Sequence, residues 1–489
     1  MKGTIKVVIL SLALVLLCSG MASATIPYYS YTYKTWQDIY PSPHIYEPIW
    51  ERFGSDMGDG IGNFNAPEDI FIDHEGNFFI ADTLNNRIVK LNGDFWCVGV
   101  IDSFDNDGRR DTFNQPTGVF VTKQNEIYIA DKENKRIVVL SDDLSLKMII
   151  NEPKSDIIPE DFKYNPLKVA VDNTGRIFVC AVSAIDGLFL FTPRGEFDRF
   201  FGSTPVKVNP IEKIWRMLYT SRQKEKVSLN LSMEYSNITI DHTGFIYATL
   251  RNQSREQVRR LNINGTNIIK TNKITDTRFG DYIRGGPGVP GSQVVDAAVD
   301  EDNNVYVLDI RTNKVYLYNI LGDMLGVIGG KSTGAMLGAM HNPASIEVKD
   351  NILYVLDGVR GSILKFEPTD FGRMIIDANK LYIEGKYVDS MDLWYEVIKL
   401  NSNYELAYIG LGNAMYKLGN YVDAMRYFDL GFYKEGYSKA FKEHRGEIIK
   451  DNFTIFMTSI VVILAGLFVL RRFMRHKNIT MRRLYGEND

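Results

Sequence analysis

The chain has 489 residues, more than one ordinary domain, and its 45% of hydrophobic and 12% of aromatic residues suffice for a sizeable packed core. Its formal net charge of −4 lacks the basic excess of nucleic-acid-binding proteins, so we expect no nucleic-acid partner.

The first 24 residues predict a secretory signal peptide. Lys2 and Lys6 precede the apolar run VVILSLALVLL, and Ala-Ser-Ala follows at 22–24, so we expect cleavage after Ala24. Residues 25–46 would then form an N-terminal extension of an exported chain. An uncleaved signal would predict the same orientation, because both lysines would stay inside.

A repeat begins at residue 77. NFFIADTLNNRIVKL at 77–91 and EIYIADKENKRIVVL at 126–140 each indicate two strands around a polar turn. A proline-opened strand precedes each copy, at 66–73 and 115–122, and another strand follows the first at 95–104. Four strands in every 40 to 50 residues, roughly, are typical of a propeller blade.

The repeat predicts six blades over residues 47–370. The position of Asp82 recurs in every blade, and the matching residues are Asp131, Ala181, Leu250, Asp309 and Asp357. The last blade supplies only three strands before Pro368, so we expect residues 49–55 to pair with 362–366 and close the ring.

These residues resemble the NHL-repeat family. The resemblance lies in GNFNAPEDIFIDHEGNFFIADTLNNRI of the first blade and DTFNQPTGVFVTKQNEIYIADKENKRI of the second, and it extends over about residues 47–368. It implies a six-bladed β-propeller.

Recurring polar residues indicate architecture more than ligand binding. Asp82, Arg87 and their counterparts repeat from blade to blade, which favours a role in holding turns or joining blades. Connections that do not repeat are better candidates for a binding site, notably 102–111 and 276–293. From these we select Arg109, Arg110, Tyr282 and Arg284.

No chemistry-bearing motif emerges from the sequence. The six histidines are scattered over the blades and the C-terminal region, so we predict no catalytic residue, metal ligand or cofactor site. Cys97 and Cys180 fall in different blades, which favours two buried thiols over a disulfide.

An insertion between the third and fourth blades predicts an amphipathic helix at about 207–228. Ile211, Ile214, Trp215 and Leu218 lie on one face of it, with basic residues elsewhere. The helix either packs on the protein or docks on the bilayer or a membrane partner.

From residue 371 the pattern becomes helical, with a repeat of 34 residues in which Gly385 matches Gly419 and Trp394 matches Phe428. Residues 371–450 therefore resemble a pair of tetratricopeptide repeats. Two such repeats bury little, so we expect 438–450 to add a fifth helix.

The C-terminal region predicts a membrane anchor. Residues 453–470 carry no charge, and Arg471, Arg472, Arg475 and Lys477 follow at once. A single transmembrane helix at 452–470 and a basic cytoplasmic tail at 471–489 would leave the propeller and the helical repeats outside the cytoplasm.

Two classes of function remain. The chain combines a signal peptide, NHL blades, a tetratricopeptide-like pair and a membrane anchor. In this combination it is similar to bacterial membrane proteins associated with carbohydrate transporters of the ATP-binding-cassette type. That resemblance implies a binding or scaffold protein with protein partners, such as transporter subunits or a solute-binding protein, or with a glycan. The alternative is an extracytoplasmic enzyme similar to sugar lactonases or propeller lyases, which the scattered histidines make less favoured.

Overall fold

A computed structural model describes residues 28–33, 39–158, 162–182, 184, 187–203, 234–251, 256–270, 279–281, 292–331 and 336–485. The signal peptide at 1–24 lies outside these residues, as do Tyr282, Arg284 and the four apolar residues selected in the insertion, Ile211, Ile214, Trp215 and Leu218. The chain divides into two compact units between Ile376 and Asp377.

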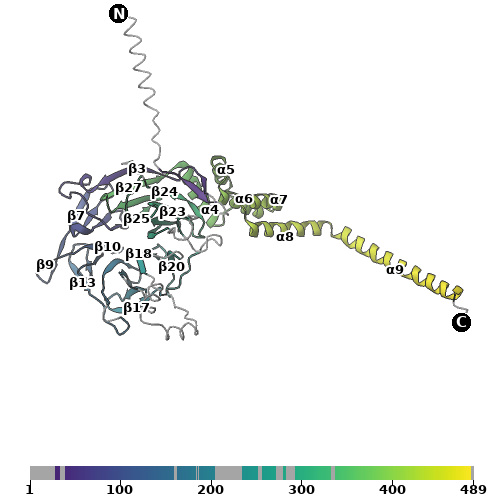
Figure 1. Cartoon of the computed structure of the whole chain (residues 1–489), viewed down its shortest axis with the longest axis horizontal. Helices are drawn as coiled ribbons and strands as arrows, with labels where there is room; N and C mark the ends of the chain where they lie inside the picture. The colour runs from purple at the N-terminus through teal and green to yellow at the C-terminus, as the bar shows by residue number, and fades with distance from the viewer. Residues whose placement is uncertain are drawn as a thin grey trace, which may run out of the picture. The chain divides into compact units, whose positions relative to one another are not determined.

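The first unit is a six-bladed β-propeller (Figure 1). Within a blade, strands that follow one another in sequence pair antiparallel. Blade 1 contains β4 (Asp69–Ile72), β5 (Phe78–Asp82), β6 (Arg87–Leu91) and β7 (Cys97–Ile101). Blade 2 contains β10 (Pro116–Val121), β11 (Ile127–Asp131), β12 (Arg136–Leu140) and β13 (Leu146–Ile150). Blade 3 contains β14 (Pro166–Val171), β15 (Ile177–Ala181), β16 (Leu188–Phe191) and β17 (Phe197–Phe201). Blade 4 contains β18 (Glu234–Ile240), β19 (Ile246–Arg251) and β20 (Val258–Leu261). Blade 5 contains β21 (Val294–Val299), β22 (Val305–Asp309), β23 (Lys314–Tyr318) and β24 (Met324–Ile328). Blade 6 contains β25 (Pro343–Lys349), β26 (Ile352–Asp357), β27 (Ser362–Pro368) and β3 (Tyr46–Phe53).

The ring closes between the two ends of the propeller sequence. β3 pairs with β27 as the outer strand of the sixth blade, with Phe53 opposite Ser362 and Glu51 opposite Leu364. The predicted pairing of 49–55 with 362–366 is therefore confirmed. Because closure joins segments far apart in the chain, the ring is complete only when both ends have folded.

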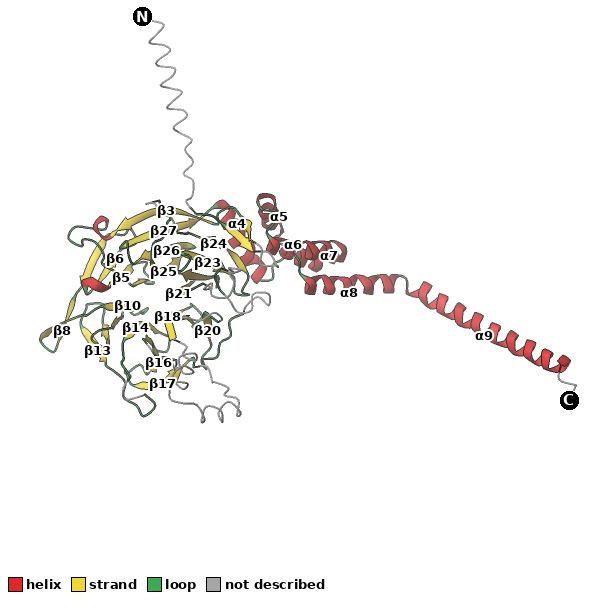
Figure 2. Cartoon of the chain, viewed as in Figure 1, coloured by secondary structure: helices red, strands yellow, loops and turns green. Residues whose placement is uncertain are grey.

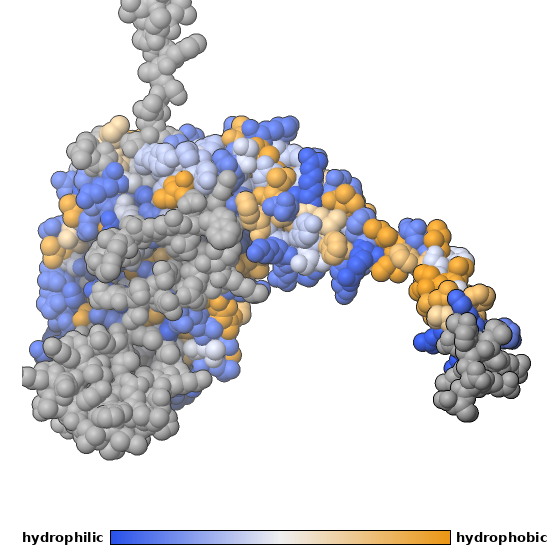
Figure 3. Space-filling view, turned by 45° about the vertical axis from the view of Figure 1, so that its right-hand side comes forward, coloured by the Kyte–Doolittle hydropathy of each residue, from blue (hydrophilic) through white to orange (hydrophobic). Residues whose placement is uncertain are grey.

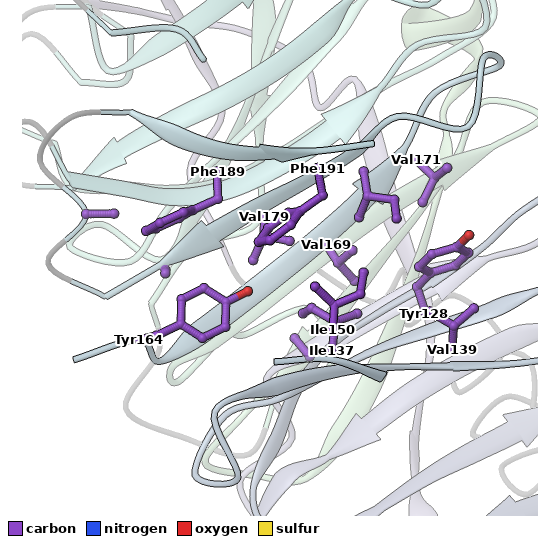
Figure 4. Close-up of a cluster of buried hydrophobic side chains, with 14 residues drawn as sticks. Tyr128, Ile137, Val139, Ile150, Tyr164, Val169, Val171, Val179, Phe189 and Phe191 are labelled. Atoms are coloured by element: carbon purple, nitrogen blue, oxygen red, sulfur yellow. The ribbon is translucent and has the colours of Figure 1, made fainter. Parts of the chain in front are cut away.

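The core lies between the blades, because each sheet is buried on both faces. On β15, Ile177 and Val179 belong to the cluster shared with blade 2, and Phe178 and Cys180 belong to the cluster shared with blade 4. Figure 4 shows the first of these clusters. Alternate side chains of one strand thus hold two neighbouring blades.

The N-terminal extension packs on blade 5. Its hairpin of β1 (Tyr31–Tyr33) and β2 (Ile39–Pro41) places Tyr31 in the core cluster of that blade. Lys314 Nζ donates to the Tyr31 hydroxyl over 2.8 Å, and Tyr33 donates to Asp281. Further along, Ile45 lies against Gly326 so closely that a Cβ there would come within 2.6 Å of its side chain.

The second unit consists of helices (Figure 2). The described residues form α4 (Asp370–Ile383), which crosses the boundary between the units, α5 (Met391–Leu400), α6 (Glu405–Lys417), α7 (Tyr421–Leu430), α8 (Lys434–Asp451) and α9 (Phe453–Tyr485).

Small residues let these helices approach closely. A Cβ on Gly412 of α6 would come within 2.5 Å of the Phe428 ring of α7, and one on Gly410 would meet Trp394 of α5. The predicted extra helix at 438–450 is present, because it is part of α8, whose Gly436 and Ala440 are buried. Packed helices are thus observed, and their assignment to tetratricopeptide repeats stays a prediction.

Helix α9 is apolar and exposed. Residues 453–477 form the one helix of the described part of the chain that is long and apolar enough to cross a membrane, and its apolar stretch has no buried portion. Hydrophobic residues follow one another along it in Figure 3. The orientation of this helix in a membrane remains a prediction.

Candidate functional site

The two ends of the propeller differ in the length of their connections. In a four-stranded antiparallel blade, the turn between strands two and three lies at the same end as the link to the next blade. The other end carries short turns such as 73–77 and 92–96. The links between successive four-stranded blades therefore share one face, here named the loop face, and those whose residues are all described span 54–68 and 102–115.

The structure brings Arg109 and Arg110 onto this face. Residues 102–111, predicted as a loop that does not repeat from blade to blade, form a second hairpin of β8 (Ser103–Asn106) and β9 (Arg109–Thr112). The reason is its turn, where Asp107 and Gly108 both adopt positive φ, a conformation that asparagine, aspartate and glycine accept readily. The Arg110 side chain is 71% exposed.

Arg136 anchors this hairpin to blade 2. Its guanidinium donates to both carboxylate oxygens of Asp111, over 2.7 and 2.9 Å, and to Asp131 over 2.8 Å. The hydrogen bonds from Arg136 lower the pKa of Asp111 to about 2. A fixed base thus presents the two exposed arginines to solvent.

The recurring aspartates are structural, as predicted. Asp82 is fully buried and accepts from the backbone N–H of Asn65, from the Asn85 amide and from Arg87, over 2.7 to 2.8 Å. Asp357 likewise accepts backbone N–H groups from the connection that enters its blade and from its own turn, including those of His341 and Arg360. These oxygens are occupied by the protein itself.

The central channel contains a set of residues that the sequence did not single out. Each blade contributes one residue of its inner strand to the centre of the ring. This residue pairs with the residue that comes just before the recurring Asp position on the second strand. Five of the six residues line one cavity, and Gly118 takes the same position in blade 2. The six residues are Asp69, Gly118, Lys168, Asn237, Asp296 and Ser345. We name the five with side-chain hydrogen bonds, all but Gly118, the polar hub; each of them is buried.

Hydrogen bonds of the hub run around the ring. Asn237 donates to Asp296, and Ser345 donates to Asp296 over 2.7 Å and to Asp69 over 3.2 Å. Lys168 bonds Asp69 from across the channel, and the backbone N–H of Val119 donates to Asp69 over 2.8 Å. One network therefore connects all six blades.

Gly118 is required where the second blade meets the hub. A Cβ at this position would lie 2.6 Å from the carbonyl oxygen of Leu167 and 2.9 Å from the Cα atom of Lys168. The absence of a side chain lets strands β10 and β14 approach, which places Lys168 over the channel.

Little room is left inside the channel. The cavity lined by the hub has a volume of about 20 Å³, enough for one or two water molecules. Phe71 and Phe120 line the cavity with their ring centroids 4.9 Å apart. Glu347 also lines it, and burial raises the pKa of this carboxyl well above its usual range.

Burial also raises the pKa of Asp69, an effect that the neighbouring Lys168 opposes. Taking an ion pair out of water is costly unless the hydrogen bonds around it are complete, and here the backbone of Val119 and the Ser345 hydroxyl help to complete them. The hub is therefore fully engaged within the protein. No group of three or more His, Cys, Asp or Glu that could hold a metal ion occurs among the described residues.

Sequence reasoning missed the hub, although a signal existed. The inner-strand residue at the hub position is polar in five blades and is Gly118 in blade 2, where a buried strand would otherwise carry apolar residues. The five polar residues are chemically different, so they do not register as a repeat. The two cysteines of the described residues are free, as expected, with Cys180 buried and Cys97 half-buried.

The fold is a six-bladed β-propeller followed by a helical unit. Residues 113–140 match the family of NHL repeats. A search of the curated proteins finds no match.

Similar solved structures include a catalytically inactive virginiamycin B lyase from Staphylococcus aureus with quinupristin, at 12% identity and a TM-score of 0.40, with 63% of this chain and 82% of that chain covered. A streptogramin B lyase is 13% identical with a TM-score of 0.39, and the match covers 62% of this chain and 94% of that chain. A Bacteroides thetaiotaomicron protein of unknown function is 14% identical with a TM-score of 0.40, and the match covers 63% of this chain and 70% of that chain. Similarities this low say nothing about activity.

Proposed function

We propose that this protein is a membrane-anchored extracytoplasmic binding or scaffold protein. Its propeller and helical unit would engage protein partners, such as the transmembrane subunits of a carbohydrate transporter of the ATP-binding-cassette type or a solute-binding protein. A glycan is the next candidate ligand.

The observation that carries this proposal is the hydrogen-bonded polar hub in the central channel. An enzyme that used the channel would need an open cavity with unoccupied acid, base or metal-ligating groups. Here Asp69, Asp296 and Lys168 make hydrogen bonds between blades, and the cavity beside them has a volume of about 20 Å³. Binding is then left to the outer surface, which suits a partner of macromolecular size.

The loop face supports the same proposal. It carries the links between blades, and its β8–β9 hairpin holds Arg109 and Arg110 exposed on an anchored base. Fixed, exposed arginines are enriched where proteins recognise one another. The exposed apolar helix α9 supports attachment to a membrane.

Affinity purification of the full-length protein from membranes, after mild cross-linking, tests the proposal. We expect transporter transmembrane subunits or a solute-binding protein to be recovered, and recovery to fall at least about fivefold in the variant Arg109→Gln/Arg110→Gln. The matched control is Arg194→Gln/Arg199→Gln, which removes two exposed charges from blade 3. Recovery of no membrane component with any variant would overturn the proposal.

A further inference from the structure

Helix α9 does not end where its apolar stretch ends. It runs for 33 residues, or about 50 Å at 1.5 Å per residue, whereas the hydrocarbon of a bilayer is about 30 Å thick. The apolar residues 453–470 account for about 27 Å of this length. The continuation from Arg471 therefore emerges from the hydrocarbon as an unbroken helix, at the depth of the lipid headgroups.

This continuation is strongly basic. Arg471, Arg472, Arg475 and Lys477 are all exposed, and the sequence holds no acidic residue between Asp451 and Glu487. No carboxylate near in sequence is thus available to neutralise them. The only large source of negative charge that a membrane places at this depth is a layer of anionic headgroups.

The spacing of these residues suits a lipid surface. Arg471, Arg472 and Arg475 lie on one side of the helix, because positions i, i+1 and i+4 fall within one third of a turn of each other. Phe473, which is 69% exposed, lies on the opposite side together with Met474 and Lys477. Arginine can bind phosphate with two parallel hydrogen bonds, and the apolar side can enter the acyl boundary.

We propose that residues 471–477 form a docking surface for anionic phospholipid headgroups. The inference rests on the proposed membrane anchoring of α9 and adds the class of lipid that the anchor selects. Each basic residue near such a surface is worth about a fivefold change in binding. The attraction is screened by salt, because the residues are exposed.

Lipid retention tests the proposal. Full-length protein is reconstituted into vesicles of two parts phosphatidylcholine and one part phosphatidylglycerol, purified in mild detergent, and its bound lipids are quantified by mass spectrometry. We expect the ratio of phosphatidylglycerol to phosphatidylcholine among the bound lipids to be at least about fivefold higher than in the vesicles. The tail variant Arg471→Gln/Arg472→Gln/Arg475→Gln/Lys477→Gln should lose this enrichment, and high salt should reduce it.

The matched control is the helical-unit variant Lys417→Gln/Lys434→Gln/Lys442→Gln/Arg445→Gln, which removes the same charge from exposed positions of α6 and α8 and should keep the enrichment. Enrichment that survives in the tail variant, or that is absent from the natural chain, overturns the proposal. Inorganic phosphate should displace no more lipid than chloride does at equal ionic strength, because stronger displacement would mean a site for free phosphate. Resistance of the protein to alkaline extraction from vesicles tests the anchor separately, so failure of the anchor and failure of lipid selection are distinguishable.

Discussion

Lys168 and Asp69 meet across the central channel although they are 99 residues apart in sequence. Their contact joins blades 3 and 1, which are not neighbours in the ring, and it is buried. Replacing Lys168 by methionine keeps most of the volume and leaves the Asp69 carboxyl without its cation. We expect Lys168→Met to lower the free energy of unfolding by about 3 kcal/mol, measured by urea denaturation of the full-length protein.

The double variant Lys168→Met/Asp69→Asn serves as the control for this pair. It removes the charge that the single variant leaves buried, so it should lose less stability than Lys168→Met alone. A single variant as stable as the natural chain would show that the pair does not hold the blades together.

Ring closure gives a second prediction. Removal of residues 25–55 deletes β3, leaving β27 with an open edge, and it also removes the segment that covers blade 5. We expect the cooperative thermal transition of the propeller to disappear. Removal of residues 478–489 touches neither blade and should leave the transition unchanged, whereas an unchanged melting curve after the first deletion would rule out this closure.

The blades could be predicted from the sequence because their strands and turns repeat. Asp82, Asp131, Asp309 and Asp357 recur at one position, since in these four blades the carboxylate accepts backbone N–H groups of the entering connection. The hub could not be predicted in this way, because a buried network needs complementary donors and acceptors from different blades. Lys168 is useful only if Asp69 faces it, and that relation exists in the closed ring alone.

The packing of the N-terminal extension also escaped sequence analysis. Tyr31 lies in the core of blade 5 through contacts with residues almost three hundred positions later, such as Tyr316 and Val327. Local pattern carries no information about such contacts. The hairpin of β8 and β9 was missed for a different reason, since its strands are mostly polar and show no alternation of apolar and polar residues.

Asp300 predicts a dependence of stability on pH. Burial raises the pKa of this carboxyl to about 6 in the folded protein, against about 3.9 in an unfolded chain. Between these values the folded state holds the proton more tightly, so the free energy of unfolding falls as the pH rises from about 4 to about 6, by at most about 3 kcal/mol.

The variant Asp300→Asn cannot titrate, yet its side-chain oxygen can still accept the backbone N–H groups of Asp302 and Asn304. Urea denaturation across this pH window should therefore show a shallower fall than in the natural chain. The control Glu301→Gln changes an exposed neighbour and should keep the natural slope. Equal slopes for the natural chain and Asp300→Asn would contradict the assignment.

Detachment of the β8–β9 hairpin gives a further prediction. In Asp111→Asn the two hydrogen bonds from Arg136 lose their charged acceptor, which frees the base of the hairpin and leaves the blade core untouched. We expect the melting temperature to change little and recovery of the membrane partner to fall, because Arg109 and Arg110 are no longer held in place. Full recovery with a demonstrably mobile hairpin would mean that these arginines do not bind the partner.

We propose that the propeller binds and does not catalyse, since the charged groups of the polar hub are engaged with one another across its channel. The most direct measurement is the hydrolysis of sugar lactones by the purified full-length protein, with divalent cations and again with a chelator. We predict no turnover above the uncatalysed rate under either condition. Hydrolysis that the chelator abolishes, and that Asp296→Asn or Glu347→Gln also removes in a folded protein, would contradict the account and place an active site in the channel.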